Sequence, residues 1–66
     1  METGVVLAPK LTGAECELLI ELLEAECRRL PAEIHHTHSG EFKGHLRRRL
    51  DAAEGLLERL KIARNA

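Results

Sequence analysis

The sequence predicts an all-α protein, an antiparallel hairpin of two long helices. Two apolar series carry this prediction, and steps of three or four residues place each series on one helix face. Facing residue numbers add up to about 76 when the chain folds back between the series, as two antiparallel helices require. The first series is Cys16, Ile20, Leu23, Cys27, Leu30 and Ile34, and the second is Phe42, Leu46, Leu50, Ala53, Leu57 and Leu60.

The first helix is expected over about residues 13–36. Thr12 and Glu15 have the spacing of a capping box, which satisfies free N–H groups at a helix start. Pro31 lacks an N–H and crowds the preceding turn, so it either ends or bends a helix. Because Leu30 and Ile34 continue the apolar series on both sides, we expect one helix that is kinked near Pro31. A helix that ends there is the alternative.

A polar turn at residues 35–40 precedes the second helix, expected over about residues 41–63. Thr37 and Ser39 both have side chains that cap such a helix. Gly55 lies inside it, where glycine costs up to about 1 kcal/mol relative to alanine. We expect Gly55, with Ala52 and Ala53, to face Ala25 and so allow the helices to approach closely.

The chain has 66 residues and is expected to form a single domain over residues 1–66. A chain of this size buries only roughly 60% of its unfolded surface, so small proteins often need association, metal or disulfides. Residues 1–10 are expected to form an extended N-terminal arm, since Pro9 and the apolar Val5, Val6 and Leu7 favour extended backbone. This arm is expected to lie across the hairpin or a neighbouring subunit.

The first helix has more apolar residues than one helix-helix seam uses. Leu18, Leu19 and Leu22 flank its apolar series, and a helix with one neighbour needs an apolar arc of only about 100°. We therefore expect two hairpins to form a homodimeric four-helix bundle. The expected interface comprises Leu18, Leu19, Leu22, Val5, Val6 and Leu7. The function predicted is a non-catalytic interaction or regulatory module, with a larger protein as a possible second partner.

Several other functions are disfavoured. Ser39 is the sole serine and no glycine-rich phosphate loop is present, so neither an enzyme nor a cofactor is expected.

Cys16 and Cys27 are spaced to lie on one helix face about 16 Å apart, which is too far for a disulfide within one chain. Reduced core cysteines are expected, with an intermolecular disulfide as the alternative. No secretion signal or membrane-length apolar run is recognisable, so we expect a cytoplasmic protein without a membrane partner.

Divalent-metal binding is the first alternative function. The candidate ligands are the histidines around the turn, and such a cluster suits zinc, nickel or copper. No established zinc spacing is present, and polar turn residues that face water account for the same pattern. We therefore predict no metal site. The candidate ligands are His35, His36, His38 and His45, with Glu41 as a possible fourth.

Weak nucleic-acid binding by a dimer is the second alternative. Arg47, Arg48 and Arg49 lie close to Lys43, but three successive helical residues fan across about 200° and form no single stripe. The net charge is −1 and Phe42 is the only aromatic residue, which disfavours nucleic acid. Surface and interhelical ion pairs with glutamates are the role we expect for these arginines.

Overall fold

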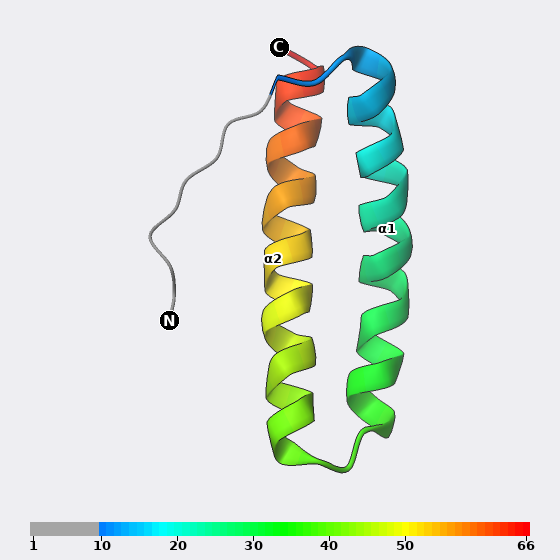
Figure 1. Ribbon diagram of the computed structural model, residues 1–66, viewed down its shortest axis with the longest axis vertical. Coiled ribbons are helices and arrows are strands. Elements are labelled where there is room, and N and C mark those ends of the chain that lie inside the picture. Colours follow the sequence, from blue (N-terminus) through cyan, green and yellow to red (C-terminus); the bar gives the residue numbers. More distant parts are fainter. Residues whose placement is uncertain (1–9) are drawn as a thin grey trace.

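The computed structural model describes residues 10–66 as two helices joined by a turn. Helix α1 spans Gly13–His36 and helix α2 spans Gly40–Arg64. The helices lie side by side and run in opposite directions, with the turn at one end and the C-terminus near the start of α1 at the other (Figure 1). The predicted all-α hairpin is confirmed for the described part of the chain. Residues 1–9, which hold most of the expected N-terminal arm, lie outside it.

Side-chain caps define the helix ends. The Thr12 hydroxyl accepts the Glu15 N–H at 3.1 Å, and the Glu15 carboxylate accepts the Thr12 N–H at 2.9 Å, which is the predicted capping box. The Ser39 hydroxyl accepts the Phe42 N–H at 3.3 Å at the start of α2. Thr37 acts at the other helix instead, because its hydroxyl donates to the Glu33 carbonyl at 2.6 Å. Thr37 therefore closes α1.

Helix α1 continues through Pro31 to His36. Leu30 is buried on one side of the proline and Ile34 is half-buried on the other. Their packing against α2 favours a continuous helix despite the donor that proline removes. The alternative that α1 ends at Pro31 is therefore wrong.

The predicted seam between the helices forms the core. The seam residues come from both helices, and the side chains of each helix pack between those of the other. All but one of the predicted seam residues are buried or half-buried. The buried ones are Ile20, Leu30, Leu46, Ala53 and Leu60, and the half-buried ones are Cys16, Leu23, Cys27, Ile34, Leu50 and Leu57.

Two expectations about α2 are wrong. Phe42 is 52% exposed, although it lies on the seam side of α2, in the first turn of that helix. Its ring stacks on His45, with ring centroids 6.1 Å apart. Gly55 is exposed, and a Cβ added there would meet nothing within 4 Å. Ala25 is exposed as well, so these small residues do not bring the helices together.

Candidate interaction surface

One side of the hairpin carries an apolar groove between α1 and α2. Its lining residues lie beside the seam, at steps of three and four along each helix, so they share one face. Glu26 and Arg49 are the only charged residues among them. The apolar members are Leu19, Leu22, Leu23, Ala52, Ala53 and Leu56. These eight residues are called the apolar groove below.

Leucine side chains at this groove remain open to water. Leu22 is 57% exposed, and Leu18, next to the groove on the outer side of α1, is 55% exposed. Leu19, Leu23 and Leu56 are half-buried. Isolated apolar side chains on a surface are ordinary, whereas contiguous ones mark surfaces that bind other molecules.

Ion pairs border the apolar groove toward the turn. The Glu26 carboxylate accepts hydrogen bonds from Arg29 on its own helix and from Arg49 on α2, and Arg29 also pairs with Glu33. The bonds from Arg29 and then Arg49 hold the pKa of the Glu26 carboxyl below its ordinary value. Arg49 thus makes an interhelical ion pair with a glutamate, as expected for the arginines of α2.

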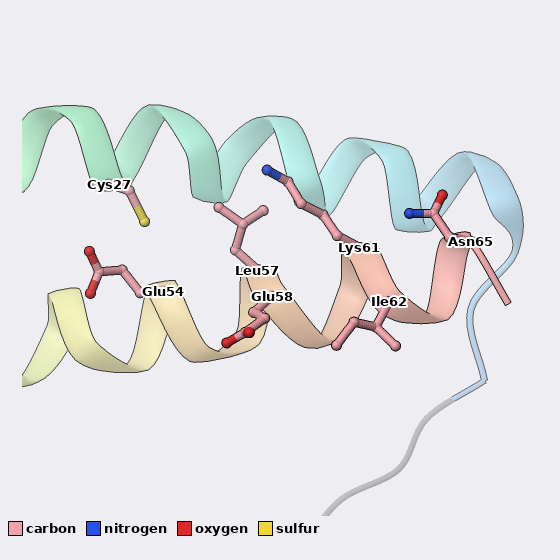
Figure 2. A pocket seen from close by; sticks show the side chains of 7 residues that line it. All are labelled: Cys27, Glu54, Leu57, Glu58, Lys61, Ile62 and Asn65. Atoms are coloured by element: carbon pink, nitrogen blue, oxygen red, sulfur yellow. The ribbon is translucent and has the colours of Figure 1, made fainter.

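The opposite side of the hairpin carries a second groove with more charge (Figure 2). It is called the charged groove, and its lining residues are Cys27, Glu54, Leu57, Glu58, Lys61, Ile62 and Asn65. Lys61 extends toward α1, where its Nζ lies 3.2 Å from the Glu24 carboxylate. Burial, and then the charge of Glu54, raises the pKa of the Cys27 thiol. This thiol is therefore a poor nucleophile at neutral pH.

The end of the hairpin away from the turn carries a third pocket, whose lining includes Leu11, Cys16 and Leu60, and polar and sulfur contacts link the two helices beside it. Arg64 pairs with Glu17 at 3.3 Å, and the Cys16 thiol lies 3.9 Å from the Leu60 carbonyl oxygen. Cys16 and Cys27 are both free and half-buried. Their positions in the seam agree with the expectation that both cysteines belong to the core.

The four histidines gather around the turn but face different neighbours. His35 and His36 meet edge to face at the end of α1, with ring centroids 5.2 Å apart. His38 is exposed in the turn, and His45 is stacked on Phe42 in α2. Within residues 10–66, no three histidine, cysteine or acidic side chains come together as a group that could hold a metal ion.

The predicted interface residues fall in two places. Leu19 and Leu22 line the apolar groove and Leu18 borders it, whereas Val5, Val6 and Leu7 lie outside the described residues. Ala52 and Leu56 were not predicted as part of this surface. Their spacing contained the signal, because Arg49, Ala52 and Leu56 follow one another at steps of three and four beside the second apolar series.

The chain matches no protein-family model, no curated protein and no solved structure at a significant level. Across residues 10–66, neither helix combines the length and the apolar character that crossing a membrane requires. The function must therefore be argued from the surface of the hairpin itself.

Proposed function

We propose that the chain is a non-catalytic interaction module that forms a homodimer through the apolar groove. The observation that carries this proposal is the exposure of Leu22 at the centre of a groove whose other central residues are leucine and alanine. Pairing two such grooves removes apolar surface from water and adds a second layer to a thin core.

The area of this face suits a dimer. Helix α1 has 24 residues and is therefore about 36 Å long, and two helices side by side are about 20 Å wide. Covering this face removes about 700 Å² from each hairpin, close to the roughly 800 Å² per partner of an ordinary stable interface. A four-helix bundle is the compact form that two hairpins adopt when they pair in this way.

The dimer is tested by placing a charge in the groove. Leu22→Glu is expected to weaken dimerisation by roughly 100-fold, because an unpaired carboxylate would be buried at the interface. Molar mass from light scattering behind a sizing column, with circular dichroism as a check on folding, measures this effect. The wild type is expected at about twice 7.4 kDa and Leu22→Glu at the monomer mass.

Ile62→Glu is the matched control, since Ile62 is 63% exposed but belongs to the charged groove. It is expected to stay dimeric. Loss of the dimer in Ile62→Glu with retention in Leu22→Glu would move the interface to the other side of the hairpin. Repeating the measurements with EDTA and with zinc tests the metal alternative, which predicts a dimer only when zinc is present.

A further inference from the structure

We propose that the two hairpins pair with both turns at the same end of the bundle, so that α1 of each copy packs on α2 of the other. This arrangement rests on the dimer proposed above and adds the relative direction of its two chains. The occupant of the apolar groove is thus a second copy of this chain in one defined orientation.

Two stripes of side chains run along the groove side of the hairpin, one on each helix. Steps of three and four residues keep each stripe on one face. The α1 stripe has three acids and one base, whereas the α2 stripe has two arginines, one histidine and no acid. The α1 stripe is Glu15, Leu19, Leu22, Glu26, Arg29 and Glu33, and the α2 stripe is His45, Arg49, Ala52, Leu56, Arg59 and Ala63.

The two stripes are in a fixed register within one chain. Glu26 pairs with Arg49 across the groove, and Leu19 and Leu56 line it together. Facing residue numbers add up to about 75 in both cases, and the uniform rise of a helix extends this register to the ends of the stripes. Glu15 therefore lies at the level of Arg59.

Pairing with the turns at the same end preserves these levels. The two-fold axis is then parallel to the helices, and each α1 stripe covers the partner's α2 stripe. Glu15 meets the partner's Arg59, and Glu26 meets the partner's Arg49. Leu19 meets the partner's Leu56 between these charged levels. Opposite charges and apolar side chains therefore both find matching neighbours.

Pairing with the turns at opposite ends reverses the order of the partner's residues along the bundle axis. When the apolar centres are superposed, Leu19 meets the partner's Leu22, but Glu15 meets the partner's Glu26. On the other helix, Arg49 meets the partner's Arg59. Like charges then face one another on both helix pairs, which disfavours this orientation.

A charge reversal at Arg59 distinguishes the two orientations by the sign of its effect. With the turns at the same end, Arg59→Glu places two carboxylates together at two symmetry-related contacts. The dimer dissociation constant is then expected to rise about tenfold. With the turns at opposite ends, the new carboxylate would face the partner's Arg49 and the dissociation constant would fall.

Arg47→Glu is the matched control for this measurement. It makes the same change in net charge at an exposed position of α2 that is not in the stripe, so it corrects for general repulsion between the subunits. Sedimentation equilibrium of the wild type and both variants supplies the constants. Equal effects of Arg59→Glu and Arg47→Glu, or a tighter Arg59→Glu dimer, would overturn the proposed orientation.

The distance between the two turns gives an independent measurement. A spin label at His38→Cys, in a chain with Cys16→Ala and Cys27→Ala, reports it by pulsed electron resonance. Turns at the same end predict a distance below about 25 Å, and turns at opposite ends predict more than about 35 Å, roughly the helix length. A dimer with the long distance would contradict only the proposed orientation. A wild-type chain that stays monomeric would contradict the proposed dimer, and with it the orientation.

Discussion

The apolar groove and the charged groove flank the same seam but are lined by different side chains. The apolar groove exposes Leu22 and has one internal ion pair, Glu26 with Arg49. The charged groove is bordered by Glu54, Glu58 and Lys61. Both sit between the same two helices, so backbone arrangement does not distinguish them. The side-chain pattern alone is therefore the basis for proposing the apolar groove as the dimer interface, although the charged groove also exposes Ile62.

The seam is common to both sides, so changes there are expected to have the largest effect on folding. Leu30→Ala is expected to lower the free energy of unfolding by about 2–5 kcal/mol, because Leu30 is fully buried and its loss leaves a cavity. Urea denaturation at a fixed protein concentration measures this effect. Leu18→Ala, the same change at a side chain that is 55% exposed, is the control. Equal losses in the two variants would contradict the assignment of the core.

Gly55→Ala is expected to have a smaller effect of the opposite sign. Gly55 lies on the outer surface of α2, where an added Cβ meets nothing, and alanine stabilises a helix interior by up to about 1 kcal/mol relative to glycine. A higher thermal midpoint, with unchanged molar mass, is the expected result. Destabilisation would indicate that this surface is covered by another part of the molecule or by a partner.

The smallest expected effect concerns the ion pairs at the apolar groove. The folded-state pKa of Glu26 lies below its ordinary value, so its ionised form contributes stability above the ordinary glutamate pKa. That contribution is lost as the pH falls through the lowered folded-state pKa. Glu26→Gln should therefore be less stable than the wild type at pH 7, and the difference should shrink below about pH 4. Denaturation curves across this range measure it, and a difference independent of pH would exclude this carboxylate as its source.

Much of the fold follows directly from the sequence. The spacing of the seam residues predicts their burial, and Thr12 and Glu15 predict the start of α1, because these patterns depend only on helix geometry. Phe42 and Gly55 differ from expectation because position on a helix face does not determine what covers that face. Phe42 is on the seam side of α2, but its ring stacks on His45 of the same helix and remains half exposed. Gly55 lies opposite the seam, and its small size serves no close approach.

The candidate surface was predictable only in part. Leu18, Leu19 and Leu22 stand out in the sequence as apolar residues beyond the needs of one seam. Their relation to Ala52 and Leu56 required the register between the helices, since a groove is formed by two elements together. The difference in charge between the two stripes depends on the same register. The periodicity of one helix could therefore indicate an excess of apolar residues on α1. It could not indicate the shape or the charge pattern of the groove that α1 and α2 form together.

Sedimentation equilibrium of the unmodified chain over a range of micromolar concentrations is the most direct test of the proposed homodimer. Interference optics are appropriate because the chain has no tryptophan or tyrosine. The expected mass approaches about twice 7.4 kDa as concentration rises. A folded species at the monomer mass throughout would contradict it, because the apolar groove would then be stable in water without a partner copy.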